Sequence, residues 1–323
     1  MVAAKKAGGV VTTLEAPRVQ QDPDPGLPVA VSPGPLPTRT AETRPLGVRL
    51  TFVLPLALSL LAVWFLVFAF VLSGLQEHAS QGRLYERFRL QLAEETAPLA
   101  EPVPVGAPVA MINSPSAGMR NVIVVEGTTS RLLKGGPGHL SDTVLPGQLG
   151  DVVLFGRSTT YGGPFGRITS MKPGERFTVT TGQGVFTYSV EDVRFPGDPL
   201  PPLLKANQSR LTLVTSVGGS WTTAWVPTHT AYVDALLVGG QAQPVPAGVP
   251  SSVSKASQPM QGDPSGLVPL IFWLEALAAA TFAIGWYWIR WGKTATWLAG
   301  APILLAALWG TSDALMRFLP NLV

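Results

Sequence analysis

The chain has 323 residues, of which 46% are hydrophobic and only 13% are charged, whereas an average soluble domain is roughly 25% charged. This composition excludes an ordinary soluble protein. The formal net charge is +3, but residues 75–240 carry 13 basic and 13 acidic side chains, so no nucleic-acid-binding surface is indicated. The absence of cysteine excludes disulfides and thiol chemistry.

Residues 1–49 form the first segment, which is rich in proline and poor in aromatic residues. Such a composition cannot bury enough apolar surface to form a core, so we expect a disordered cytoplasmic tail. The alternative interpretation is a proline-rich docking segment for a partner.

Three apolar runs, 50–72, 267–289 and 295–312, are candidates for transmembrane helices, because a helix needs about 20 residues to cross the hydrocarbon core. The first run follows a long polar segment and precedes no small-residue cleavage site, which predicts an uncleaved anchor. Basic residues flank the first run and fill the turn between the other two: Arg39, Arg44, Arg49, Arg290 and Lys293. They predict a cell-membrane protein with a cytoplasmic N-terminus, and with residues 73–266 and the C-terminal tail outside.

The region between the first two runs begins with Leu84, Phe88 and Leu92, whose four-residue spacing predicts an amphipathic helix. From 102 to 239, short apolar strands alternate with glycine and proline, which is typical of one closed barrel or sandwich. Residues 241–266 are rich in proline, serine and glutamine and predict a flexible tether back to the membrane.

Several phrases of this region carry a family resemblance: GAPVAMI, VVEGTTSRLLKGGPGHLSDTVLPGQLGDVVLFG, STTYGGPFGRITSMKPGERFTV, FTYSV and RLTLVTS. In this order they resemble a class E, actinobacterial sortase of high-GC Gram-positive bacteria. The resemblance covers about half of the chain. It implies a mainly β fold, an eight-stranded sortase-type β-barrel over 75–240 with its N-terminal helix, on the extracytoplasmic side of three transmembrane helices. In active relatives it also implies a membrane-bound cysteine transpeptidase that joins proteins to the cell wall.

Active sortases that resemble this chain use a histidine, a cysteine and an arginine at three motif positions. Matching TTYG, LTLVT and YVDALL puts Arg157, Ser216 and Thr230 at these positions. A guanidinium accepts no proton, a serine hydroxyl needs an adjacent base, and a threonine supplies no positive charge to an oxyanion. The resemblance therefore implies a degenerate member whose catalytic positions are vestigial.

Ser216 has two interpretations. It either caps local backbone at the end of its strand, or lines a groove with Arg157 that still holds an extended peptide. A dyad of Ser216 with His229 is an alternative, but strand neighbours point to opposite faces, so His229 faces away if Thr230 faces the groove.

Other candidate residues have less specific patterns. Tyr161 and Phe165 in TTYGGPF are groove walls or core residues, and core is the better interpretation of Phe165. His139 in GPGH suggests a structural role in its loop, and His78 a solvated position beside the first span. Three scattered histidines without cysteine give no metal-ligand spacing, so we expect no metal and no other cofactor.

The membrane runs contain one acidic residue, Glu275 in the second. An ionisable group within a span is costly and often functional, and Arg317 beyond the third run is its candidate partner. The alternative is a shallow glutamate whose side chain reaches the headgroups.

Two hypotheses for function follow from these residues. The first is a catalytically inactive, membrane-bound binding or assembly module for a cell-envelope protein or peptide. The second is an unconventional Ser216-dependent transpeptidase or hydrolase that acts on cell-surface proteins.

Overall fold

The computed structural model describes residues 46–218, 227, 229–245, 252–290 and 292–323, with side chains from residue 54 onward. Most of the predicted tail, residues 1–45, lies outside the described residues, and residues 46–49 already belong to a helix. The chain divides into two compact units, Met1–Phe52 and Val53–Val323. The second unit contains a β-barrel, the helix before it and the C-terminal helices.

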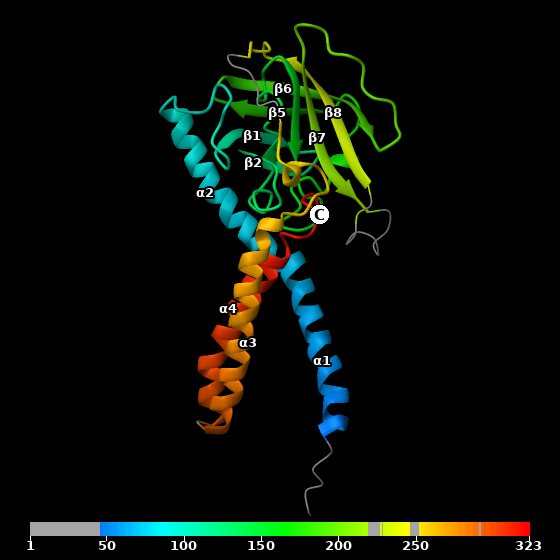
Figure 1. Ribbon diagram of the computed structural model, residues 1–323. Coiled ribbons are helices and arrows are strands. Elements are labelled where there is room, and N and C mark those ends of the chain that lie inside the picture. The colour runs from blue at the N-terminus through cyan, green and yellow to red at the C-terminus, as the bar shows by residue number, and fades with distance from the viewer. Residues whose placement is uncertain (1–45, 219–226, 228, 246–251, 291) are drawn as a thin grey trace, which may run out of the picture. The chain divides into compact units, whose positions relative to one another are not determined.

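Eight strands form a closed barrel in the order β1-β2-β3-β4-β7-β8-β6-β5, which leaves no strand edge unpaired (Figure 1). Neighbouring strands are antiparallel except for the pairs β2/β3 and β4/β7. The strands are β1 (Pro108–Ser114), β2 (Met119–Glu126), β3 (Gly138–His139), β4 (Gly150–Phe155), β5 (Arg176–Thr181), β6 (Gly184–Arg194), β7 (Ser209–Val217) and β8 (His229–Gly239). The eight-stranded barrel expected from the sequence is thus confirmed.

Strand β7 is buried at every position but its last, so both of its faces are covered. On one face, Leu211 and Leu213 join the central core of the barrel. On the other, Val214 packs in a second cluster that includes Leu322, from the far end of the chain. Because of this double burial, polar side chains of β7 such as Thr215 and Ser216 lie inside the protein and form hydrogen bonds there.

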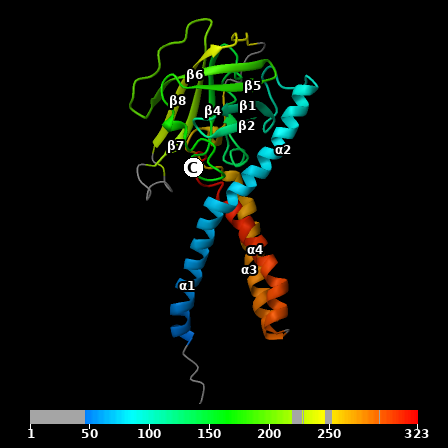
Figure 2. The ribbon, with the colours of Figure 1, turned by 180° about the vertical axis from the view of Figure 1, so that it is seen from behind.

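Within the part of the chain that the structure describes, three helical segments are long and apolar enough to cross a membrane: Leu54–Ala93, Pro264–Arg290 and Lys293–Leu315. The first contains most of α1 (Leu46–Val67), a π-helical turn (Phe68–Leu72) and α2 (Ser73–Ala93). The other two contain α3 (Leu267–Arg290) and α4 (Lys293–Leu315), which run side by side in both views (Figure 1, Figure 2). These helices agree with the three expected apolar runs.

Helix α2 is amphipathic, as its spacing predicted. Phe88 is fully buried and clusters with Ile123 of β2, while Leu84 and Leu92 are partly buried against the same cluster. The start of α2 is also attached to the barrel, because the Ser73 hydroxyl accepts a hydrogen bond of 3.0 Å from the backbone N–H of Tyr161.

Of the expected tether, 241–266, residues 246–251 lie outside the described residues, and residues 252–266 form hydrogen bonds with other parts of the chain. They contain two 3-10 turns, Lys255–Ser257 and Pro264–Gly266. The Thr128 hydroxyl donates to the carbonyl oxygen of Ser257 at 2.6 Å. The backbone N–H of Asp263 donates to the carbonyl oxygen of Arg317 at 2.8 Å. The stretch is thereby bound both to the barrel and to the end of the chain.

Gly156, directly after β4, offers a test of the packing that positions the next residue, Arg157. A Cβ at Gly156 would lie 2.3 Å from the buried ring of Phe165, so we expect Gly156→Ala to lower the free energy of unfolding by about 1–3 kcal/mol through overpacking. The matched control is Gly82→Ala in α2, where a Cβ meets nothing within 4 Å and helix propensity should raise stability by up to about 1 kcal/mol. Chemical denaturation of the full chain in detergent measures both. Equal effects of the two substitutions would contradict the packing described.

Candidate functional site

The three motif positions singled out in the sequence, Arg157, Ser216 and Thr230, lie around one point of the barrel. Strands β4 and β7 are parallel and in register, and the Thr215 hydroxyl donates to the carbonyl oxygen of Gly156 at 2.9 Å. Arg157 therefore follows Gly156 beside the end of β7. Thr230 lies directly opposite Ser216 in the ladder of β7 and β8. We call these surroundings the Arg157–Ser216 site.

The end of the chain, residues 319–323, occupies this site and is called the C-terminal segment below. The carbonyl oxygen of Leu322 accepts two hydrogen bonds, from the Ser216 hydroxyl at 2.7 Å and from the backbone N–H of Ser158 at 2.9 Å. The backbone oxygen of Val323 accepts from Nη1 of Arg157 at 2.8 Å and from the Thr160 hydroxyl. The segment is thus held through successive backbone oxygens, as a bound peptide is.

Side chains of the segment are recognised as well. The Asn321 amide donates to the carbonyl oxygens of Thr128 at 2.9 Å and Gln258 at 3.0 Å. Leu322 is fully buried in an apolar cluster with Leu133, Phe155 and Val214. Burial of a leucine side chain is worth roughly 1.5–3 kcal/mol, so the segment has both polar and apolar anchors.

Arg157 is a buried cation whose guanidinium connects the barrel to the segment. Its exposed fraction is 0%. Nη2 donates to the carbonyl oxygen of Ser130 at 3.0 Å and to its hydroxyl at 2.9 Å, while Nη1 also donates to the Thr160 hydroxyl at 3.1 Å. The guanidinium carbon lies 5.0 Å from the centre of the Tyr161 ring, a cation–π distance. Burial lowers the pKa of Arg157 to about 10, so the group remains a protonated donor near neutral pH and accepts no proton.

Ser216 is 3% exposed, and its hydrogen-bond partners are the Ser158 hydroxyl and the Leu322 carbonyl oxygen. Because it donates its proton to Leu322, it accepts from the hydroxyl of Ser158, whose oxygen is 2.8 Å away. Among the residues that the structure describes, no imidazole or carboxylate is hydrogen-bonded to Ser216. Thr230 donates to the Tyr232 hydroxyl at 3.0 Å, and His229, exposed, pairs with Val217 at the next position of the ladder. Within the described residues, the Ser216 hydroxyl is thus hydrogen-bonded to another hydroxyl and to a backbone carbonyl.

Tyr161 and Phe165 do not line a groove together. Phe165 lies in the central core of the barrel, as preferred from the sequence. Tyr161 is also buried, but its ring packs in a separate apolar cluster with Phe68 and Met316, and its hydroxyl donates to the Asp313 carboxylate of α4 at 3.1 Å. Burial, and to a lesser degree Asp313, raises the pKa of Tyr161, so the hydroxyl stays protonated as a donor.

Lys134 and Asp313 complete this cluster and were missed by the sequence analysis. Nζ of Lys134 lies 2.8 Å from the Asp313 carboxylate and 2.7 Å from its carbonyl oxygen. Burial lowers the pKa of Lys134 to about 8, although Asp313 opposes the shift. The one signal in the sequence was an acidic residue directly after the third apolar run.

The pairing of Glu275 with Arg317 was one of two interpretations of Glu275, and the structure gives Arg317 another neighbour. Glu275 is exposed on α3, whereas Arg317 lies 3.8 Å from the Asp313 carboxylate one helical turn earlier in the chain. Arg317 and Asp313 are neighbours at the end of α4, so proximity in sequence outweighs the longer reach to α3.

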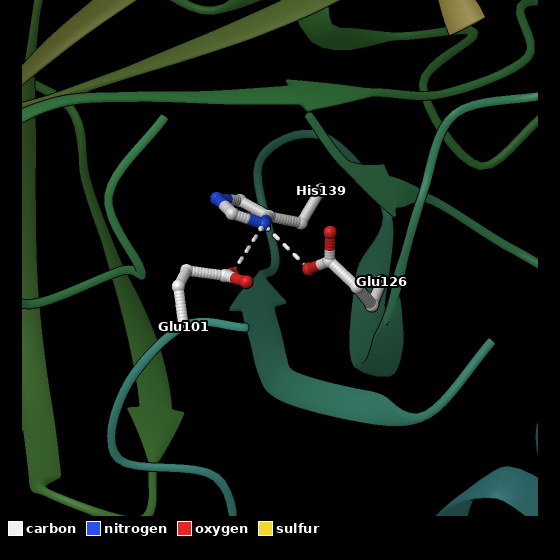
Figure 3. Close-up of side chains that lie close together, drawn as sticks. All are labelled: Glu101, Glu126 and His139. Carbon is white, nitrogen blue, oxygen red and sulfur yellow. Dashed lines mark hydrogen bonds and ion pairs between the residues drawn. The ribbon is translucent and has the colours of Figure 1, made fainter. Parts of the chain in front are cut away.

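A second cluster joins His139 of β3, Glu126 of β2 and Glu101 of the preceding loop (Figure 3). Nδ1 of His139 lies 2.7 Å from the Glu126 carboxylate and 3.7 Å from that of Glu101, and all three side chains are buried. Nε2 lies 3.0 Å from the carbonyl oxygen of Val144, so it carries a proton.

These ligand atoms lie within 4.8 Å of one another, and such a set can hold a metal ion. In the arrangement observed, the Nδ1 atom that faces the carboxylates is hydrogen-bonded to Glu126. Burial, and repulsion from Glu126, raise the pKa of Glu101 above its usual range despite a hydrogen bond from Val103. The cluster is a buried hydrogen-bonded group that joins β2, β3 and the loop of Glu101.

Comparisons with known proteins identify the domain. Residues 112–220 match the family model for the sortase domain. No curated protein matches the chain.

Among solved structures, a sortase D5 transpeptidase from Clostridium perfringens is 22% identical with a TM-score of 0.42, and the match covers 50% of this chain and 99% of that chain. Sortase A from Corynebacterium diphtheriae is 19% identical, with a TM-score of 0.37 and coverage of 50% and 85%. The SrtA sortase from Actinomyces oris is 26% identical, with a TM-score of 0.38 and coverage of 44% and 85%.

The unequal distances to His139 generate a prediction for stability. We expect Glu126→Gln to lower the free energy of unfolding by about 1–3 kcal/mol, because it removes the carboxylate that is hydrogen-bonded to the buried His139 ring at 2.7 Å. Glu101→Gln should cost no more than about 1.5 kcal/mol, because an amide oxygen can still accept from Val103. Denaturant titration of both variants in detergent checks the order. An equal or larger loss for Glu101→Gln would refute the assignment of Glu126 as the main partner.

Proposed function

We propose that this chain is a catalytically inactive member of the class E sortases, and that it works as a membrane-bound binding or assembly module at the envelope of a Gram-positive cell. Its partner is a cell-envelope protein or peptide. The barrel faces the outside of the cell membrane, and the N-terminus faces the cytoplasm.

The state of Arg157 carries this proposal. The resemblance expects a histidine at this position, which in active relatives exchanges protons during catalysis. Arg157 uses its charge to hold Ser130, Thr160 and Val323 instead. A permanently protonated donor cannot serve as a general base, so the step that activates a nucleophile has no agent here.

The environment of Ser216 gives the same indication. A serine attacks an amide only when a base removes its proton, whereas the partners of Ser216 are a hydroxyl and an amide carbonyl. Thr230, opposite Ser216, adds no charge for an oxyanion. A Ser216-dependent transpeptidase or hydrolase would need all three functions from other residues.

The arrangement of the helices supports the orientation. The C-terminal segment contacts the barrel directly, so both lie on one side of any membrane that α3 and α4 cross as a pair. Basic residues between these two helices, Arg290 and Lys293, favour a cytoplasmic turn and hence an external barrel.

The test uses the full chain in nanodiscs with a fluorophosphonate probe and with peptides of cell-envelope proteins. We expect wild type and Ser216→Ala to give the same labelling, and neither to form an acyl adduct detectable by intact-mass spectrometry. A label or adduct on wild type that disappears in Ser216→Ala would establish the enzyme hypothesis instead.

A further inference from the structure

The contacts of the C-terminal segment are those of a ligand in a built site. Two successive backbone oxygens, of Leu322 and Val323, accept four hydrogen bonds from the barrel. The bond from Arg157 is charge-assisted, and such bonds are about twice as strong as neutral ones. Leu322 fills an apolar pocket, and the buried Asn321 amide donates to backbone on two different loops.

The segment covers the one atom of the site that resembles a nucleophile. Ser216 is 3% exposed, and its hydroxyl is hydrogen-bonded directly to the segment. Arg157 has no exposed surface at all, and one of its two terminal nitrogens reaches the segment. While residues 319–323 stay in place, no other molecule can reach the positions that they occupy.

The end of α4 is tied to the same site through a second set of contacts. Asp313 binds Lys134 and the Tyr161 hydroxyl, and the Tyr161 ring packs beneath the Arg157 guanidinium. Both ends of the stretch 313–323 are therefore fixed by the two loops that carry Lys134 and Arg157. Since α4 continues directly into the segment, a shift of α4 that separates Asp313 from Lys134 also pulls on residues 319–323.

We propose that residues 319–323 are an intramolecular plug of the Arg157–Ser216 site, and that the contacts of Asp313 with Lys134 and Tyr161 latch this plug to the membrane helices. The proposal rests on the proposed function, because a module that receives a partner at this site must first release the plug. Movement of the α3–α4 hairpin in the membrane then controls access to the site. The membrane part of the chain is thereby a regulatory element as well as an anchor.

A single introduced thiol measures whether the plug is in place. The chain has no cysteine, so Ser216→Cys places one reporter under the segment. We expect this thiol to react slowly with a maleimide in the full chain in nanodiscs. Adding Leu322→Asp, which puts a charge into the apolar pocket, should expel the segment and raise the rate by about tenfold or more, the factor that corresponds to 1.4 kcal/mol of docking free energy. The matched control is Leu203→Asp, the same change at a side chain that is 98% exposed, and it should leave the rate unchanged.

The latch is tested in the same background with Lys134→Met, which we expect to raise the rate by a smaller factor than Leu322→Asp. Arg131→Met, an exposed cation of the same loop, is its control. A circular dichroism melt of each variant shows that the barrel remains folded.

A Lys134→Met rate equal to that of Arg131→Met would overturn the latch. Fast reaction of the thiol in the full chain, or equal rates for the two aspartate variants, would overturn the plug. The thiol rates test only the plug and the latch. The probe-labelling experiment tests catalytic inactivity, so failure of one proposal is distinguished from failure of the other.

Discussion

A guanidinium without solvent contact must find acceptors for its donors inside the protein, because an unpaired buried charge costs several kcal/mol. At Arg157 the two terminal nitrogens find acceptors on Ser130, Thr160 and Val323, whereas Nε has no acceptor among the described residues. Two of them belong to loops of the barrel, and the third lies 166 positions later in the chain. This single requirement connects the barrel to Val323 and keeps the Arg157 side chain a hydrogen-bond donor in this site.

Helices α3 and α4 connect the barrel to this site. They lead away from the barrel and back to it, and the hydrogen bond from the Asp263 N–H to the Arg317 carbonyl oxygen joins the two ends of this hairpin. The Lys134–Asp313 ion pair attaches the end of α4 to the loop that carries Lys134. The barrel, the hairpin and the segment thus form one structural unit within Val53–Val323.

Local sequence patterns were sufficient for much of this architecture. The barrel followed from motifs on consecutive strands, Phe88 from helical spacing, and the proximity of Arg157, Ser216 and Thr230 from motif positions on neighbouring strands. In each case the residues that decide the structure are close in sequence or belong to one sheet.

The contacts that escaped prediction join segments with no shared pattern. The final residues after α4 have neither helical nor strand periodicity, so nothing in them indicated that Asn321 and Leu322 would be buried at β7. The tether was expected to be flexible because composition does not reveal that Ser257 and Gln258 receive hydrogen bonds from Thr128 and Asn321. Similarly, Glu101 comes from a loop far from His139 in sequence, so the buried cluster was invisible to a search for ligand spacing.

Hydrogen exchange at two neighbouring amides tests the central claim, that the end of the chain occupies the Arg157–Ser216 site. The Gly156 amide donates to Val214 within the barrel, whereas the Ser158 amide donates to Leu322 of the segment. We predict that both amides are protected in the full chain, and that deletion of residues 319–323 removes the protection of Ser158 while Gly156 keeps its own. A Ser158 amide that exchanges in the full chain as fast as in the deletion variant would contradict the account.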